Sequence, residues 1–198
     1  MCAARFLGRL LYNFRGRDEQ LLTNQLNVKE NPQTITITSP LFEDNGYMPI
    51  ETAGKGVGDD KSPSLSIKVE PNAEITSLVL ILQDIDAPVP FAITHMLVYD
   101  IAPAPEITFE LGELAVTEDH PDKFKLGFDT FKYVGYMGPR PVPGHGDHRY
   151  VFQVFGINET ATTALRNFEG RPNTANVIAA IKGNVKAHGV LTGLYKRD

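Results

Sequence analysis

The sequence predicts a mainly β protein, a single-domain sandwich of two antiparallel sheets with a few peripheral helices. Short runs of alternating, β-branched residues recur along the chain, and 17 glycines and 14 prolines punctuate it, which is typical of strands joined by turns. The regular alternation of strand and helix that a parallel sheet requires is absent. A length of 198 residues suits one domain that needs no disulfide or metal to hold its core.

Hydrophobic periodicity locates the strands. Residues 34–38 and 64–69 alternate with a period of two, as strands with one buried face do. Residues 77–83 are continuously apolar, so both faces of that strand should be covered. The remaining predicted elements are strands at 93–101, 150–157 and 184–195, helices at 160–168 and 174–182, and loops at 44–62 and 137–146.

Residues 1–25 form a helical segment that precedes a predicted sandwich domain of residues 26–198. Residues 1–17 contain four arginines and no acidic residue. Their apolar residues recur at helical spacing, which leaves two interpretations open. The segment is either a helix that packs its apolar stripe on the core, or a mitochondrial transit peptide. The stripe consists of Phe6, Leu7, Leu10, Leu11 and Phe14.

Charge and composition exclude several classes of protein. The formal net charge is −5, which disfavours nucleic acid as a partner. No run approaches the roughly 18 apolar residues of a transmembrane helix. The single cysteine, Cys2, excludes an internal disulfide and multi-cysteine zinc sites. It suits a reducing compartment, so we expect a cytoplasmic protein, with the mitochondrion as the alternative that the arginine-rich start allows.

Two aspartates, Asp84 and Asp86, follow the apolar strand and precede Ala87-Pro88. A period of two places both carboxylates on one side of the chain. They either cap backbone N–H groups in a turn or contribute to a polar site. Two carboxylates that lie close together repel each other unless a cation or a proton lies between them.

Four further polar residues lie in predicted strands or directly before one. His95 interrupts the apolar strand 93–101, and its position shortly after the aspartates suggests an Asp–His contact. His148 and Tyr150 are two residues apart, so they share one face, and Arg149 between them faces the other way. We expect Arg149 to pair with a carboxylate.

A metal site is not predicted. His145, His148 and the two aspartates could supply ligands, but their spacing fits no standard zinc signature. Neither a nucleophile-elbow serine nor a phosphate-binding glycine loop is present. We therefore expect no metal and no other cofactor.

These segments together resemble the phosphatidylethanolamine-binding protein family, also called Raf-kinase-inhibitor-like proteins. The family pattern is Asp-Pro-Asp-Ala-Pro, then a histidine in a strand, then Gly-Pro and a glycine-rich stretch that ends in His-Arg-Tyr. This chain has Ile85 where the family pattern has proline, which frees a backbone N–H in that turn. The matching residues are Asp84-Ile85-Asp86-Ala87-Pro88, His95, Gly138-Pro139 and His148-Arg149-Tyr150, and Gly144-His145-Gly146 is similar to the bacterial and fungal branch.

The resemblance implies a Greek-key β-sandwich with a pocket at one end for a small anion. The anion would be a phosphate, a phosphomonoester or a carboxylate. Should the site be catalytic, the candidate residues are Asp84, His95 and His148. The residues implied to bind the ligand are Asp84, Asp86, Pro88, His95, Gly138, Pro139, His148 and Tyr150, with the Gly138 N–H as one donor.

Two functions remain open at this point. The first is a binding protein for a phosphorylated or carboxylate ligand, with a regulatory role; kinase inhibition rests on the family name alone. The second is an enzyme-like acid/base helper that acts on a carboxylate or anhydride in a fungal biosynthetic pathway, because similar fungal proteins occur in pathways that assemble anhydride-bearing products. Resemblance to the bacterial branch also suggests a homodimer.

Overall fold

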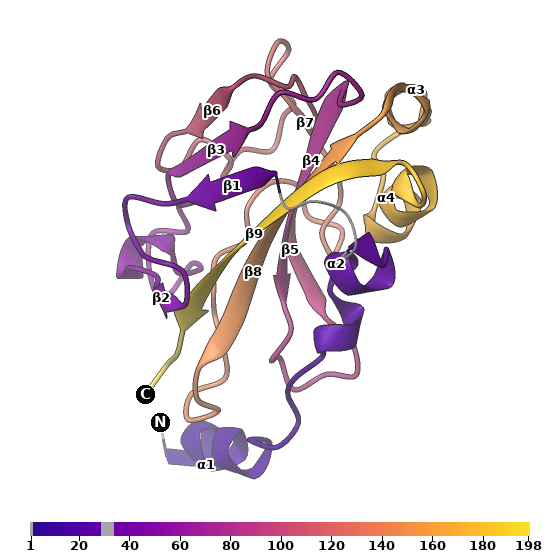
Figure 1. The fold of residues 1–198 in the computed structure, drawn as a ribbon. Coiled ribbons are helices and arrows are strands. Elements are labelled where there is room, and N and C mark those ends of the chain that lie inside the picture. Colours follow the sequence, from indigo (N-terminus) through magenta and orange to yellow (C-terminus); the bar gives the residue numbers. More distant parts are fainter. Residues whose placement is uncertain (1, 29–33) are drawn as a thin grey trace.

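Two sheets stack face to face in the computed structural model, which describes residues 2–28 and 34–198 (Figure 1). In this part of the chain the larger sheet has the strand order β2-β9-β8-β4-β5-β7. Neighbouring strands are antiparallel except in the short pair β2–β9, which is parallel. The bounds are β2 Gly46–Tyr47, β9 Val185–Tyr195, β8 His148–Ile157, β4 Ser77–Asp84, β5 Ile93–Ile101 and β7 Lys125–Leu126.

The smaller sheet consists of β1 (Ile35–Thr38), β3 (Leu65–Val69) and β6 (Glu106–Phe109), in the order β1-β3-β6. Its strands alternate buried and more exposed residues, because one face packs on the larger sheet and the other meets solvent. Ile37 and Ile67 face each other in the β1–β3 register. Both belong to the main hydrophobic core between the two sheets.

The central strand β4 is buried along its whole length, as its continuous apolar run predicts. Leu80 and its even-numbered neighbours belong to the core between the sheets. Val79 and Ile81 belong to a second core under the helices. Those helices are α2 (Leu22–Gln25), α3 (Glu159–Arg166) and α4 (Thr174–Ile181), and Asn158 and Asn173 accept hydrogen bonds that cap α3 and α4.

Two buried glutamines of the larger sheet anchor the segment before β1. Gln83 Oε1 accepts a hydrogen bond of 3.0 Å from the Leu22 N–H, and Gln153 Oε1 accepts one of 3.0 Å from the Thr23 N–H. The Gln153 amide also donates to Gln83 Oε1, at 2.8 Å. The sheet thereby satisfies N–H groups that the start of α2 cannot satisfy itself.

The first helix, α1 (Cys2–Leu10), packs through Gly8 and not through its apolar stripe. Gly8 is buried, and a Cβ atom there would lie 2.1 Å from the Pro143 carbonyl oxygen. Phe6 and Leu10, by contrast, are 70% and 66% exposed. The expectation that the stripe packs on the core is therefore wrong, because the helix approaches a backbone surface that only a glycine can meet so closely. The transit-peptide interpretation stays a prediction.

The predicted mainly β sandwich is confirmed, and the predicted strands lie within two residues of their bounds. β8 begins earlier than predicted, at His148, and the expected loop 44–62 contains β2 and a 3₁₀ turn, η3 (Ile50–Thr52). The division of the chain at residue 25 stays a prediction, and Met1 and residues 29–33 lie outside the described residues. Among the described helices, none is long and apolar enough to span a membrane.

Candidate functional site

The pairing of β4 with β8 brings Asp84 and His148 together. Asp84 ends β4 opposite Tyr150 in the β4–β8 register, and its Oδ2 atom lies 2.8 Å from His148 Nδ1. Its Oδ1 atom accepts hydrogen bonds from the N–H groups of Asp86 and Ala87, at 2.8 and 3.1 Å. Asp84 therefore both caps the turn and orients the imidazole. The turn-capping interpretation is confirmed for this residue, and its part in a ligand site stays a prediction.

A second histidine extends this contact toward α1. His148 Nε2 lies 2.7 Å from His145 Nδ1, and His145 Nε2 lies 2.9 Å from the Leu11 carbonyl oxygen. A carbonyl oxygen only accepts, so His145 Nε2 carries a proton. Burial lowers the pKa of His145, which favours a neutral ring whose Nδ1 accepts from His148. Asp84, His148 and His145 thus form one hydrogen-bonded chain that reaches the Leu11 carbonyl oxygen at the end of α1.

His95 lies on the other side of Tyr150. Its Nδ1 atom lies 2.8 Å from the Met137 carbonyl oxygen, and its ring meets the Tyr150 ring edge-on at 5.2 Å. His95 Nε2 is buried and has no hydrogen-bond partner among the described residues. Burial lowers the pKa of His95 and raises that of Tyr150, so both groups are neutral near pH 7.

Asp86 belongs to a separate ion pair. Burial alone would raise its pKa, but hydrogen bonds from Arg149 hold the pKa below its ordinary value. Arg149 Nε and Nη2 each lie 2.8 Å from an Asp86 oxygen, and the Arg149 N–H adds a bond of 3.0 Å. Arg149 also reaches Asp18, at 2.9 Å. The prediction that Arg149 pairs with a carboxylate is confirmed.

The structure brings four of the eight predicted ligand-binding residues into one buried group: Asp84, His95, His148 and Tyr150. Pro88 is half-buried and Pro139 is buried. Two expectations are wrong. Asp86 turns to Arg149 and not to the side of Asp84, because β4 has ended and the period of two no longer holds. The Asp–His contact also involves His148, not His95.

Gly138 has a packing role. Its N–H donates to Asp60 Oδ1 at 2.7 Å, so this donor is already engaged and the expectation that it serves an anion is wrong here. A Cβ atom at Gly138 would lie 2.4 Å from the Thr52 carbonyl oxygen. The glycine therefore permits a close approach of two loops.

Sequence reasoning missed His145 as a partner of His148. The available signal was the spacing His145-Gly146-Asp147-His148, which places the two rings 4.8 Å apart and was weighed only as a metal-ligand pattern. Among the residues that the structure describes, no group of three or more histidine, cysteine, aspartate or glutamate side chains could hold a metal ion.

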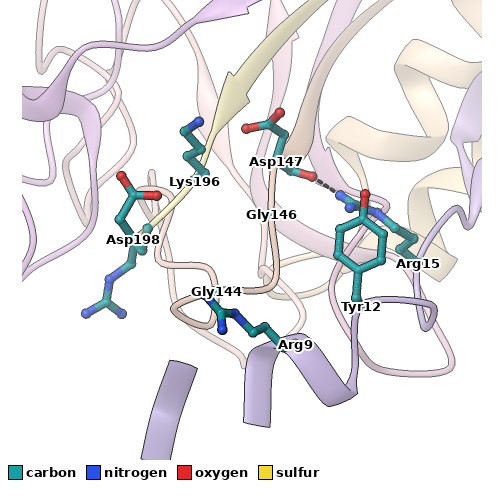
Figure 2. A pocket seen from close by; sticks show the side chains of 9 residues that line it. Arg9, Tyr12, Arg15, Gly144, Gly146, Asp147, Lys196 and Asp198 are labelled. Carbon is teal, nitrogen blue, oxygen red and sulfur yellow. Dashed lines mark hydrogen bonds between the residues drawn. The ribbon is translucent and has the colours of Figure 1, made fainter. Parts of the chain in front are cut away.

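Two hollows open on the surface near these elements. One, of about 310 Å³, lies between α1 and the end of β9 and is lined by Arg9, Arg15, Lys196 and Arg197 among others (Figure 2). The other, of about 720 Å³, lies beside α4 and includes Thr94 and Asp129. None of the eight predicted ligand-binding residues lines either hollow; Asp84, His95, His148 and Tyr150 form a closed group.

Comparison with known proteins identifies the family of this chain. The family model described as phosphatidylethanolamine-binding protein matches residues 38–196, which includes every residue of the buried group. The chain belongs to the phosphatidylethanolamine-binding protein family. It is 32% identical over 168 residues to a UPF0098 protein of Pyrococcus horikoshii, covering 85% of this chain and 79% of that protein.

Other members of the phosphatidylethanolamine-binding protein family share the fold. YbcL of E. coli has a TM-score of 0.69 at 22% identity, over 83% of this chain and 99% of that one. A homologue from Chlamydia trachomatis has a TM-score of 0.67 at 24% identity, over 84% and 100%. Among fungal proteins, phomoidride biosynthesis cluster protein B of a fungal species is 28% identical over 196 residues, covering 96% of this chain and 92% of that protein.

Replacing Arg149 should destabilise the protein strongly. In Arg149→Met the buried Asp86 carboxylate loses both guanidinium hydrogen bonds and keeps Arg15, 3.7 Å away, as its remaining cation. We expect the free energy of unfolding to fall by about 2–3 kcal/mol, less than for a fully buried pair, because Arg149 is partly exposed and Arg15 remains. Urea unfolding measures the change. The control Arg166→Met removes a more exposed ion pair with Asp100 and should cost at most about 1 kcal/mol. Equal losses in the two variants would contradict the assignment.

Acidification from pH 7.5 to 5.5 should destabilise the protein. Burial lowers the pKa of His95, His145 and His188. As the pH falls below about 6.5, these histidines are therefore protonated in the unfolded chain but stay neutral in the folded protein. Stability is therefore greatest above that pH and falls toward the folded-state pKa values, by on the order of 1–2 kcal/mol at pH 5.5. Urea unfolding at both pH values tests this, and His188→Gln should reduce the difference. A protein that is equally or more stable at pH 5.5 would refute it.

Proposed function

We propose that this protein binds a small anion (a phosphate, a phosphomonoester or a carboxylate) at the buried group of Asp84, His95, His148 and Tyr150. The observation that carries the proposal is His95 Nε2, a buried ring nitrogen without a hydrogen-bond partner in the described chain. Buried polar atoms normally have a partner. This nitrogen belongs to a ring that packs against Tyr150, beside the Asp84–His148 pair.

Binding at His95 requires a proton. Nδ1 of the ring donates to the Met137 carbonyl oxygen, and burial keeps the ring neutral by lowering its pKa. The Nε2 atom therefore carries a lone pair and no proton, and the lone pair repels an anion. The anion therefore either arrives with a proton or binds together with one from solvent. In both cases one proton accompanies the ligand, and its affinity falls as the pH rises.

The buried group also requires movement before it can bind a ligand. Asp84, His95, His148 and Tyr150 are each at most 5% exposed. His145 is fully buried beside His148 and is held by the Leu11 carbonyl oxygen at the end of α1. A ligand reaches the group when this covering segment withdraws, which makes slow association the expected kinetic behaviour.

Isothermal titration with inorganic phosphate, glycerol phosphate and acetate tests the proposal. We expect at least one of the three to bind, with an affinity that drops by up to about tenfold per pH unit between pH 6 and 8, since one proton is linked to binding. The variants His95→Gln and His148→Ala should each weaken that binding by about tenfold or more, because each removes a polar group of the site.

The matched control is His188→Gln. His188 also has a buried nitrogen without a partner among the described residues, but it stands apart from the site, and its loss should leave affinity unchanged. Absence of binding by all three anions, or unchanged affinity in both His95→Gln and His148→Ala, would refute the proposal. Binding lost in Arg9→Gln but kept in His95→Gln would instead place the anion in the surface hollow beside α1.

A second candidate function is acid/base assistance to a carboxylate or anhydride substrate. It is favoured by the hydrogen bond between Asp84 and His148, which continues through His145 to the end of α1. The similarity to phomoidride biosynthesis cluster protein B extends over 96% of this chain, which supports a biosynthetic context. A hydrogen-bonded carboxylate–imidazole pair is suited to transferring a proton to or from a bound substrate.

Hydration of 2,3-dimethylmaleic anhydride, followed by ultraviolet absorbance, tests this second function. The protein should accelerate the reaction, and Asp84→Asn and His148→Ala should each lower the rate by about 10²-fold or more, as expected for loss of general acid/base catalysis. His188→Gln should leave the rate unaltered. A rate equal to that of buffer alone, or equal rates in wild type and His148→Ala, would exclude this activity.

A further inference from the structure

The outer side of α1 is an exposed apolar surface. Phe6, Leu7, Leu10 and Phe14 are between 50% and 70% exposed. Phe6 and Leu10 stand one helical turn apart, so they share a face, whereas Gly8 lies on the opposite face and packs on the Pro143 carbonyl oxygen. The helix thus packs on the protein through the face that contains Gly8 and exposes its apolar face to solvent. A large exposed apolar surface of this kind usually marks a site that a partner covers.

A cationic hollow adjoins this helix. Arg9 of α1, Arg15, Lys196 and Arg197 line it, together with two carboxylates, Asp147 and Asp198. Figure 2 shows Arg9 extending from α1 beneath Gly144, with Lys196 and Asp198 across the hollow. Arg15 is already engaged: it donates to the Asp147 carbonyl oxygen, lies over the Tyr12 ring and pairs with the Asp86 carboxylate at 3.7 Å. In the described chain the Arg9 side chain has no hydrogen bond or ion pair, so it is available to an anion.

The cations are concentrated at this end of an acidic protein. Residues 2–17 hold four arginines and no acidic residue, whereas the whole chain has a net charge of −5. An anionic surface is therefore attracted at this end and repelled elsewhere, within the roughly 8 Å over which exposed charges act at physiological salt. This uneven distribution of charge favours an anionic membrane over a second copy of the chain as the partner of this surface. A second copy related by a two-fold axis would bring two copies of this arginine-rich surface together, with no acidic residue among residues 2–17 to offset their charge.

We infer that the outer side of α1 and the cationic hollow beside it dock the protein on an anionic phospholipid membrane. Phe6 and Leu10 enter the boundary between head groups and acyl chains, as the apolar residues of interfacial amphipathic helices do. Arg9 meets lipid phosphates, whose oxygens match the fork of a guanidinium group. This surface is distinct from the buried Asp84–His148 group and does not depend on an anion binding there.

The absence of tryptophan from the chain provides a direct measurement. In Leu10→Trp the only indole lies on the exposed side of α1, so the variant should fold normally. Its fluorescence should shift to shorter wavelength when vesicles of equal parts phosphatidylglycerol and phosphatidylcholine are added, and not with phosphatidylcholine alone. The same substitution at Phe131, which is also about half exposed but outside this surface, should give no shift.

Vesicle co-sedimentation of the full chain tests the two contributions separately. Phe6→Ser with Leu10→Ser should weaken binding to the phosphatidylglycerol vesicles by about tenfold or more. Arg9→Gln should weaken it by about fivefold, since one basic residue near an anionic surface contributes about 1 kcal/mol, and 0.5 M salt should weaken wild-type binding as well. Lys182→Gln, an exposed change at the end of α4 and outside this surface, is the control and should bind like wild type.

Several outcomes would overturn the inference. No sedimentation with phosphatidylglycerol vesicles, or equal binding to phosphatidylcholine, would refute it directly. A concentration-dependent dimer that the Phe6→Ser, Leu10→Ser protein loses, with no vesicle binding by wild type, would assign the surface to a second copy. Binding of soluble glycerol phosphate that depends on Arg9, without vesicle binding, would assign the hollow to a soluble phosphate.

Discussion

The pairing of β4 with β8 is the constraint on which the site depends. Their register places Asp84 opposite Tyr150, so the carboxylate at the end of one strand meets the imidazole at the start of the other. Both strands lie in the middle of the larger sheet and are covered on both faces. A shift of one residue would turn the polar groups of the strand end toward the opposite face. The polar group is therefore as rigid as the sheet that carries it, and its burial strengthens each hydrogen bond within it.

The segment before α2 completes the site from outside. The Leu11 carbonyl oxygen accepts from His145, the Gly16 N–H donates to Asp86 at 3.1 Å, and the Arg17 N–H donates to the Ile85 carbonyl oxygen at 2.8 Å. These contacts fall on the two chain segments that contain Asp84 and His148. The same stretch of chain thus covers the buried group with one side and presents an apolar surface with the other.

The strands were predictable because alternation and continuous apolar runs reflect burial on one face or two. The convergence of Asp84 with His148 was not, since strand register cannot be read from periodicity; it came from the resemblance to a family. Asp86 was misplaced because the alternation ends where β4 ends. The packing of α1 was misjudged because a hydrophobic pattern shows which side of a helix is apolar, and not whether the protein lies on that side. Gly8 makes the contact, and glycine contributes nothing to that pattern.

The N-terminal segment is attached to the sheet in two places, one at α2 through two glutamines and one through residues 8–17. Gln83 and Gln153 hold Leu22 and Thr23 inside the core, whereas residues 8–17 contact the loops just beyond the ends of β4 and β8. Release of α1 would leave it tethered by about a dozen residues, which span at most roughly 40 Å when extended. A tethered helix returns by an intramolecular step, at an effective concentration in the millimolar range for a short flexible linker. Even weak contacts therefore keep α1 in place over the buried group most of the time. A partner that binds α1 with moderate affinity is then enough to displace it.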